Sequence, residues 1–302
     1  MQIRPEDIIQ TGSLNLLAKK AVEGYITGFH KSPFQGYSVE FAEHRQYNSG
    51  ESTKNIDWKL FARSDKLYNK QYDEETNLRC HFLIDASPSM QLKYEGLLTK
   101  LQYAISMTAS FLELLKKQRD ASSLCFFDNE ILEFTKVSSS TRHYKEIMSK
   151  MEHFLNFKSQ KTDTDISATI HQIANQVHRR GLVVLFTDFF DKDQSLTHFF
   201  DSIRHLKYHK HEVIIFHILH KKSEFNFDFG NVPVRFEDPE TGESIKLLPH
   251  EIKIKYQESM NDFQSDLIGE LHQHKIEYVP VDISGSLNQS IVPFLVKRKK
   301  MR

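Results

Sequence analysis

The first strongly apolar run of the sequence, Cys80–Ile84, is followed by three oxygen-bearing side chains. Asp85 closes the run, and Ser87 and Ser89 come after it at two-residue spacing. A tight loop can turn one carboxylate and two hydroxyls at this spacing toward a single point. Hard cations such as Mg²⁺ prefer compact sets of oxygen ligands. The pattern therefore predicts that Asp85, Ser87 and Ser89 bind a divalent cation.

A second carboxylate and a third hydroxyl come from later segments. Asp188 stands at the end of the apolar run Gly181–Thr187, and Thr162 and Thr164 lie shortly before an expected helix. If the two apolar runs form neighbouring strands, Asp85 and Asp188 face the same crevice. We therefore expect one metal site built from separate loops, with one of the two threonines contributing to it.

The same residues also have plainer interpretations. Ser87, Ser89 and Asp165 are of types that cap helices, and Asp188 is an ordinary carboxylate for the end of a strand. Each residue taken alone is better explained in this way. Taken together, in this order and each at an expected strand end or loop, they favour the metal site.

Alternating apolar patterns predict the elements that position these residues. Short apolar runs indicate buried strands, at residues 80–85, 123–128, 131–137, 181–188, 212–219 and 276–283. Apolar residues at helical spacing indicate helices, at residues 94–117, 141–154, 165–179, 195–206 and 250–274. This alternation predicts an α/β fold with a doubly wound, mostly parallel sheet and helices on both faces. Ligands of such sheets bind beyond the carboxyl ends of the strands.

The chain changes character near residue 79, so two parts are expected. Residues 1–78 predict a small N-terminal module that contains a helix and a small sheet. Its expected helix and strands lie at residues 13–23, 37–41 and 66–72. Residues 79–302 predict the larger α/β domain. Within that domain, residues near 224–248 are expected to form an inserted hairpin that turns at Pro239–Gly242.

Composition limits the classes of function. The 302 residues are 39% hydrophobic, which is enough for a buried core, and 40 basic residues balance 40 acidic ones. A neutral chain has no global attraction to nucleic acid or to an anionic membrane, so neither is an expected partner. The sequence has no signal-type start and no run of about 18 apolar residues. We therefore expect a cytoplasmic protein, with Cys80 and Cys125 as buried thiols.

The segment before residue 79 is similar to the signature of a known family. It contains, in order, Phe41-Ala42-Glu43-His44-Arg45-Gln46-Tyr47, Gly50, Ile56-Asp57-Trp58-Lys59 and Ala62-Arg63. The later pattern of Asp85-x-Ser87-x-Ser89, a threonine and Asp188 resembles the metal-ion-dependent adhesion site of von Willebrand factor A domains. Together the two patterns resemble the domain-of-unknown-function 58 family, over roughly residues 30–220.

The resemblance implies a von Willebrand A-like, non-catalytic protein that recognises a partner through its ion. The implied ligands are Asp85, Ser87, Ser89, Thr164 and Asp188, the last two directly or through water. The implied ion is Mg²⁺, with Mn²⁺ or Ca²⁺ as alternatives. Such sites leave a coordination position for an acidic side chain of a protein partner. Members are bacterial and are often encoded beside MoxR-type AAA+ ATPases, so an adaptor or substrate-recognition role with such an ATPase is expected.

The sequence departs from the family pattern at two places. After Gly50 the family usually carries an acidic residue, and here Glu51 is followed by Ser52 and Thr53. The loop before the threonine also lacks the family's usual glycines. The choice between Thr162 and Thr164 therefore stays open. The step from Thr164 through Asp165 to Ile166 resembles the family's Thr-Asp-Leu step, which favours Thr164.

Most enzyme classes lack their motifs in this sequence. There is no Gly-rich phosphate loop, no His-Glu-x-x-His and no serine nucleophile elbow. The alternative function is a Mg²⁺-dependent phosphohydrolase of the haloacid-dehalogenase type, which also places an Asp after its first strand. That chemistry needs a second Asp two residues later, where this chain has Ser87. A structural interaction domain with a vestigial site is a third interpretation.

Three further groups of residues have open roles. His205, His209, His211, His217 and His220 either complement helix ends or form a transition-metal site. Asp191 and Asp193, near Asp188, either start a helix or assist the ion. The N-terminal signature contains Arg45, Tyr47, Asp57, Trp58 and Arg63. Either Trp58 anchors this segment against the main domain while Asp57 pairs with Arg63, or the group forms a second recognition surface.

Overall fold

A computed structural model describes most of the chain as two compact units. The described residues are 14–16, 18, 19, 22, 41–47, 56–72, 78–159, 166–177, 179–189, 196–238 and 242–287. One unit comprises residues 1–28 and 78–302, and the other comprises residues 29–77.

The larger unit is built on a sheet of six strands in the order β10-β7-β6-β3-β4-β5. The strands are β3 (Arg79–Asp85), β4 (Ala121–Phe127), β5 (Ile131–Phe134), β6 (Leu182–Thr187), β7 (Glu212–Leu219) and β10 (Glu277–Asp282). All neighbouring strands pair in parallel except β4 and β5, which pair antiparallel. The predicted α/β class with a mostly parallel sheet is therefore confirmed.

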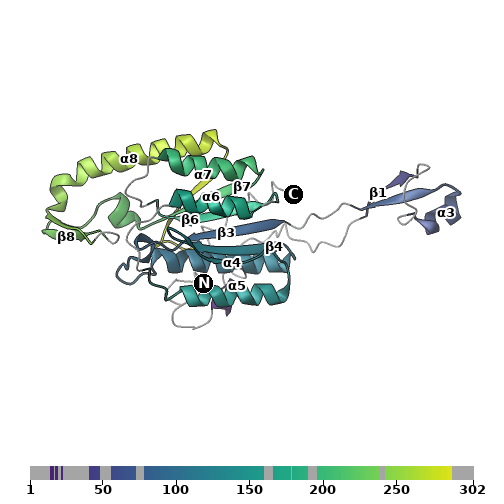
Figure 1. The fold of residues 1–302 in the computed structure, drawn as a ribbon, viewed down its shortest axis with the longest axis horizontal. Helices are drawn as coiled ribbons and strands as arrows, with labels where there is room; N and C mark the ends of the chain where they lie inside the picture. The colour runs from purple at the N-terminus through teal and green to yellow at the C-terminus, as the bar shows by residue number, and fades with distance from the viewer. Residues whose placement is uncertain are drawn as a thin grey trace. The chain divides into compact units, whose positions relative to one another are not determined.

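Helices cover both faces of this sheet. Figure 1 shows α4 (Lys100–Lys117) and α5 (Thr141–Phe154) on one face, and α6 (Ile166–Gln176), α7 (Leu196–Tyr208) and α8 (Pro249–Gln273) on the other. Because both faces are covered, β3 and β6 bury nearly every residue. This burial explains why their sequences read as continuous apolar runs.

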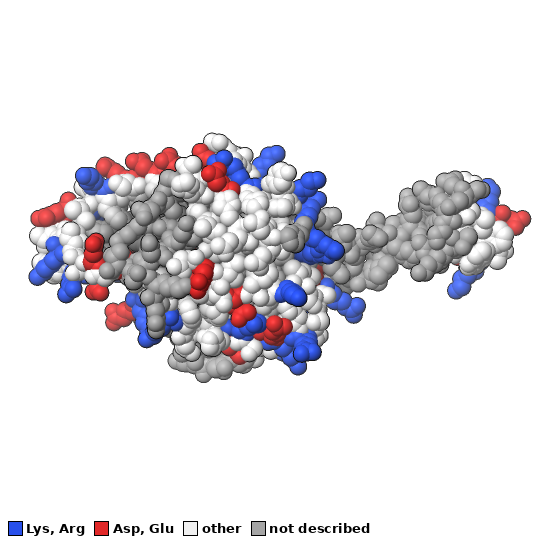
Figure 2. Space-filling model, in the orientation of Figure 1, with Lys and Arg blue, Asp and Glu red and all other residues white. Residues whose placement is uncertain are grey.

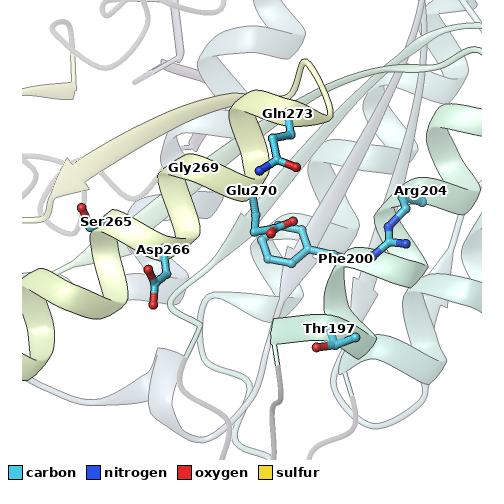
Figure 3. Close-up of a pocket in the computed structure, with 8 residues that line it drawn as sticks. All are labelled: Thr197, Phe200, Arg204, Ser265, Asp266, Gly269, Glu270 and Gln273. Carbon is cyan, nitrogen blue, oxygen red and sulfur yellow. The ribbon is translucent and has the colours of Figure 1, made fainter.

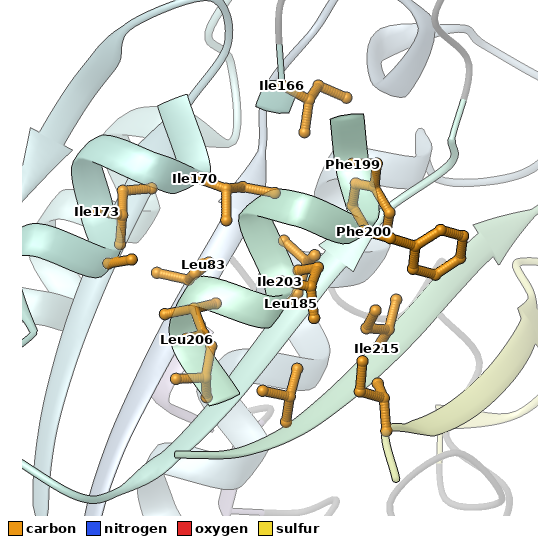
Figure 4. Packing of buried hydrophobic residues seen from close by; sticks show 14 of the residues in the cluster. Leu83, Ile166, Ile170, Ile173, Leu185, Phe199, Phe200, Ile203, Leu206 and Ile215 are labelled. Carbon is orange, nitrogen blue, oxygen red and sulfur yellow. The ribbon is translucent and has the colours of Figure 1, made fainter. Parts of the chain in front are cut away.

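The two faces of the sheet carry different cores. On the α4 face, Phe111 lies near Phe82, Phe186 and Phe216, with ring centroids 5.7 to 6.4 Å apart. On the other face, isoleucines of α6 and the apolar side chains of α7 cover Leu83 and Leu185 (Figure 4). Neighbouring residues of one strand thus point into opposite cores, which fixes the register of β3 and β6.

Two predicted elements differ from the structure. The helix expected from Tyr94 begins at Lys100, because Thr99 and Gln102 form a capping box that defines the helix start. The expected hairpin region begins with η3 (Lys221–Phe225), a π-helix, before the antiparallel pair β8 (Val234–Glu237) and β9 (Ser244–Leu247). The periodicity of the sequence reports neither a capping residue nor a π-helix.

The smaller unit contains a two-stranded sheet and a short helix. Strands β1 (Phe41–Gln46) and β2 (Tyr68–Tyr72) pair antiparallel, and α3 (Trp58–Ser64) lies between them in sequence. Asp57 caps α3 by accepting hydrogen bonds from two backbone N–H groups, a role that the sequence did not suggest. The strand expected at 37–41 lies outside the described residues except for Phe41. Within its own unit Trp58 is exposed, and its ring lies edge-on to that of Phe61, with centroids 6.2 Å apart.

The surface and the cysteines agree with the composition. On the face of the larger unit in Figure 2, basic and acidic side chains are interspersed, with acidic groups gathered over α8. Both cysteines are buried free thiols, as predicted. In the part of the chain that the structure describes, no helix is both long enough and apolar enough to span a membrane.

Gly181 directly precedes β6 and lies close to Arg79, the first residue of β3. A Cβ at Gly181 would lie 2.6 Å from the carbonyl oxygen of Arg79. Gly181→Ala should therefore lower the free energy of unfolding, by about 1–3 kcal/mol as other overpacked sites do. Gly269→Ala, in α8 with no atom within 4 Å of the new methyl group, should raise it by up to about 1 kcal/mol. Urea unfolding of both variants measures the difference, and equal stability of Gly181→Ala and the native chain would contradict the packing described.

Candidate metal centre

Asp85 lies at the carboxyl end of β3 and is completely buried. Its Oδ1 accepts a hydrogen bond from the backbone N–H of Ser87 at 2.9 Å. Its Oδ2 accepts a hydrogen bond from the hydroxyl of Thr187, the last residue of β6, at 2.8 Å. The carboxylate is thus held from its own loop and from the neighbouring strand. Such bonds fix the orientation of the oxygens before any ligand arrives.

The two serines link Asp85 to Asp188. The hydroxyls of Ser87 and Ser89 are 3.1 Å apart, and Ser89 donates a hydrogen bond to Oδ1 of Asp188 at 3.1 Å. All four side chains are buried. The parallel pairing of β3 with β6 brings the two strand ends together, so Asp85 and Asp188 lie at the same edge of the sheet, as expected for neighbouring strands. Both hydroxyls face side chains of this group, which answers the alternative that they only cap a helix.

The backbone after β6 turns sharply to place Asp188. Phe189 has a φ of 55°, in the left-handed region that residues other than glycine rarely adopt. Its ring is buried against Phe199 and against His217 of β7. Backbone conformations of this kind persist only where the surrounding packing enforces them, and they gather at functional sites. Here Phe199 and His217 hold the ring of Phe189, and with it the left-handed backbone directly after Asp188.

His217 supports the same turn from β7. One of its ring nitrogens, Nε2, lies 3.1 Å from the carbonyl oxygen of Asp188, and the other, Nδ1, lies 2.7 Å from the hydroxyl of Tyr278. Burial lowers the pKa of His217 to about 4, so the ring is neutral at pH 7. A neutral ring that donates through Nε2 and accepts through Nδ1 satisfies both contacts.

A buried lysine is part of the centre, although no sequence pattern indicated it. Lys100, the first residue of α4, is fully buried and donates a hydrogen bond to Oδ2 of Asp188 at 2.8 Å. Its ammonium group also contacts the carboxylate of Glu224. Burial alone would lower the pKa of Lys100, but Asp188 and Glu224 raise it above its ordinary value. Lys100 is therefore charged at pH 7.

Glu224 comes from η3 and is held by three donors. Besides Lys100, these are the hydroxyl of Tyr94 and the backbone N–H of His220, the latter at 2.8 Å from Oε2. Lys100 and Glu224 are 124 positions apart, and neither stands at the end of an apolar strand where a ligand site is expected. No sequence pattern therefore connects them. Thr187 could have been found, because it directly precedes Asp188 at the end of a predicted strand.

Several predicted residues lie outside the described part of the chain. These are Thr162, Thr164, Asp165, Asp191 and Asp193. The structure therefore brings together Asp85, Ser87, Ser89 and Asp188, and the contribution of a threonine stays a prediction.

The predicted histidine cluster divides, because His217 and His220 contact the candidate centre whereas His205 and His209 contact each other. His205 and His209 are one helical turn apart, as expected, with their Nε2 atoms 3.3 Å from each other, and His171 lies against the other nitrogen of His205. Among the described residues, no group of three or more His, Cys, Asp or Glu side chains is arranged to hold a metal ion. A transition-metal site therefore finds no support here.

A surface groove lies between α7 and α8. It has a volume of about 500 Å³, and Figure 3 shows Phe200 and Arg204 of α7 opposite Glu270 and Gln273 of α8. It contains none of the predicted metal ligands. The groove is thus not part of the candidate centre.

The donor set of the centre fits a hard divalent cation. Its candidate ligands in the described chain are carboxylate and hydroxyl oxygens, without sulfur or nitrogen. Asp85, Asp188, Glu224 and Lys100 provide three carboxylates and one ammonium, which leaves two negative charges when all are ionised. Burial and then the charge of Asp188 raise the pKa of Asp85 to about 7. A carboxylate that binds a proton so readily is one that a cation would stabilise.

Comparisons with known proteins give a family and several similar folds. A family model described as "Protein of unknown function DUF58" matches residues 43–265. Similar solved structures include the conserved hypothetical protein BatB from Bacteroides thetaiotaomicron, at 15% identity and a TM-score of 0.45, covering 74% of this chain and 99% of that one. An aerotolerance-related membrane protein from Bacteroides fragilis matches at 16% identity and a TM-score of 0.46, with coverage of 73% and 99%.

A third similar structure is the SpRpn10 VWA domain, at 13% identity and a TM-score of 0.40, covering 72% of this chain and 94% of that domain. A comparison with proteins of curated function returns no match.

The raised pKa of Asp85 predicts how stability depends on pH when divalent ions are chelated. Between the ordinary pKa of 3.8 and about 7, the folded chain keeps a proton that the unfolded chain has released. The folded state then binds more protons, so this group lowers stability as pH rises through that window. Urea unfolding in EDTA at several pH values should show a smaller loss for Asp85→Asn than for the native chain. The exposed Asp262→Asn serves as the control, and parallel profiles for all three proteins would exclude a raised pKa at Asp85.

Proposed function

The chain belongs to the DUF58 family, and we propose that it is a non-catalytic, metal-dependent protein-binding protein that works with a MoxR-type AAA+ ATPase. The observation that carries the metal dependence is the meeting of Asp85, Ser87, Ser89 and Asp188 at the ends of two adjacent strands. Mg²⁺ is the proposed ion, with Mn²⁺ or Ca²⁺ as alternatives. The proposed compartment is the cytoplasm.

The chemistry of the site explains why a protein would be the ligand. Asp85 and Asp188 are the carboxylates that meet directly at the serine hydroxyls, and Lys100 already neutralises part of the charge of Asp188. An ion held by so few negative ligands keeps affinity for another carboxylate. An acidic side chain of a partner would supply that carboxylate. Ligand and metal would then depend on each other for binding.

The alternative, a Mg²⁺-dependent phosphohydrolase, meets an obstacle at Ser87. A general acid is needed two residues after the first Asp, and the Ser87 hydroxyl instead lies against Ser89. A serine nucleophile would need a histidine base. His217, the histidine described beside Asp188, has its two nitrogens directed at a carbonyl oxygen and at Tyr278. These contacts favour binding over catalysis.

The proposal of a MoxR-type ATPase as partner rests on the resemblance of the sequence to the DUF58 family. It is tested by retention of the purified ATPase on the immobilised chain, with MgCl₂ or with EDTA. We expect retention in Mg²⁺ that EDTA abolishes. Asp85→Ala should weaken retention by about 10- to 100-fold, the usual effect of disturbing a metal site. Asp262→Ala, at an exposed position of α8, removes the same charge away from the site and should bind like the native chain.

Two outcomes would contradict the proposal. Retention that survives both EDTA and Asp85→Ala would show that the ion has no part in binding. Turnover of p-nitrophenyl phosphate in Mg²⁺ that is lost in Asp85→Asn would instead support the phosphohydrolase.

A further inference from the structure

Lys100 places a permanent positive charge within the candidate metal centre. We infer that Lys100 is a tethered cation that competes with the divalent ion for Asp188, and that Glu224 weakens this competition by attracting the same ammonium group. The inference rests on the proposed function, because the ion is the one assigned to this centre. It adds a residue that sets ion affinity and a second that adjusts it.

Burying the charged side chain of Lys100 at the start of α4 destabilises the folded state unless the charge is paired. A cation at the first residue of a helix opposes the helix dipole, and a buried ammonium pays a large desolvation cost. The side chain of Lys100 has 0% exposure, and that of Asp188 has 1%. The ion pair between Nζ and Oδ2, at 2.8 Å, offsets that cost. The lysine is thus part of the centre itself.

Asp188 has an oxygen for each side of the centre. Oδ1 accepts from Ser89, whose hydroxyl also contacts that of Ser87, and Oδ2 accepts from Lys100. A divalent ion bound between Asp85 and Asp188 would share Asp188 with the ammonium group. Two cations that share one carboxylate repel each other, and repulsion is strong in a buried site. Lys100 must therefore lower the affinity for the ion.

Glu224 gives the ammonium group a second partner. It contacts the same ammonium group as Asp188, its side chain is 17% exposed, and it accepts hydrogen bonds from Tyr94 and from the backbone N–H of His220. Lys100 can shift toward Glu224 without losing all of its pairing. With a neutral residue at 224, Lys100 would lose one of its two described counter-charges and depend more on Asp188, so displacement by an ion would cost more.

Glu224 belongs to the inserted segment, and contacts from α8 hold that segment in place. The hydroxyl of Tyr256 in α8 donates to the carbonyl oxygen of Glu224 at 2.8 Å, and Gln257 donates to that of Asn226 at 2.8 Å. Phe227 packs on the ring of Tyr256, with centroids 4.4 Å apart. The π-helix is thus clamped to α8, and single π-helical turns are frequent at functional sites. Through Glu224, the insertion contributes to ion affinity.

The inference predicts changes of opposite sign at two positions. Lys100→Met removes the competing charge and keeps most of the side-chain volume, so Mn²⁺ should bind about tenfold more tightly. Glu224→Gln leaves Lys100 on Asp188, so Mn²⁺ should bind about tenfold more weakly. Lys117→Met removes the same charge from an exposed position of α4, about 25 Å along the helix from residue 100 at 1.5 Å per residue, and should change affinity less than twofold.

Calorimetric titration of the full chain with MnCl₂ measures these affinities. Thermal unfolding with and without Mn²⁺ is the second readout, in which Lys100→Met should gain more stability from the ion than the native chain does. If Lys100→Met does not fold, Glu224→Gln decides, because it keeps the lysine and the volume of the side chain.

The outcomes separate this inference from the proposed function. Native-like Mn²⁺ affinity in both variants overturns the role of Lys100 and leaves the proposed function standing. Binding by Lys100→Met but not by the native chain supports the tethered cation and contradicts ion-dependent partner binding by the native chain. No binding by any of the proteins overturns both.

Discussion

Two buried carboxylates at the ends of adjacent parallel strands constrain the rest of this molecule. Asp85 and Asp188 are brought together by the pairing of β3 with β6, where helices cover both faces of the sheet and exclude water. Buried charges are tolerated only when they are paired or bound to a cation. Asp188 pairs with Lys100 and accepts a hydrogen bond from Ser89. Asp85 accepts hydrogen bonds from the hydroxyl of Thr187 and the backbone N–H of Ser87.

The balance of charge gives the centre its chemistry. With Lys100 paired to both Asp188 and Glu224, the group stays two positive charges short of neutrality when fully ionised. A proton on Asp85, whose pKa is raised to about 7, partly meets that deficit, and a divalent ion would meet it fully. Tyr256 of α8 holds the backbone of Glu224. A change in the inserted segment that moves Glu224 would therefore alter the charge around Lys100 and Asp188, and with it the proposed ion affinity.

Sequence patterns predicted the parts of the molecule that depend on burial and on strand order. The continuous apolar runs before Asp85 and Asp188 indicated covered parallel strands, and the rule that ligands bind beyond such strands indicated where to expect the candidate centre. Lys100 and Glu224 could not be predicted, because a lysine in a helix and a glutamate in an insertion are usually solvated and only the fold brings them together. The start of α4 was misplaced because the Thr99 capping box overrides apolar spacing. The threonine remains a sequence prediction.

The most direct test of the shared ion is anomalous diffraction from crystals grown with Mn²⁺. The account predicts one manganese peak between the carboxylates of Asp85 and Asp188, bound by the hydroxyls of Ser87 and Ser89, and no such peak in crystals of Asp85→Ala. Manganese bound elsewhere, or carboxylates that keep only Lys100 and protein hydrogen bonds in saturating Mn²⁺, would contradict it.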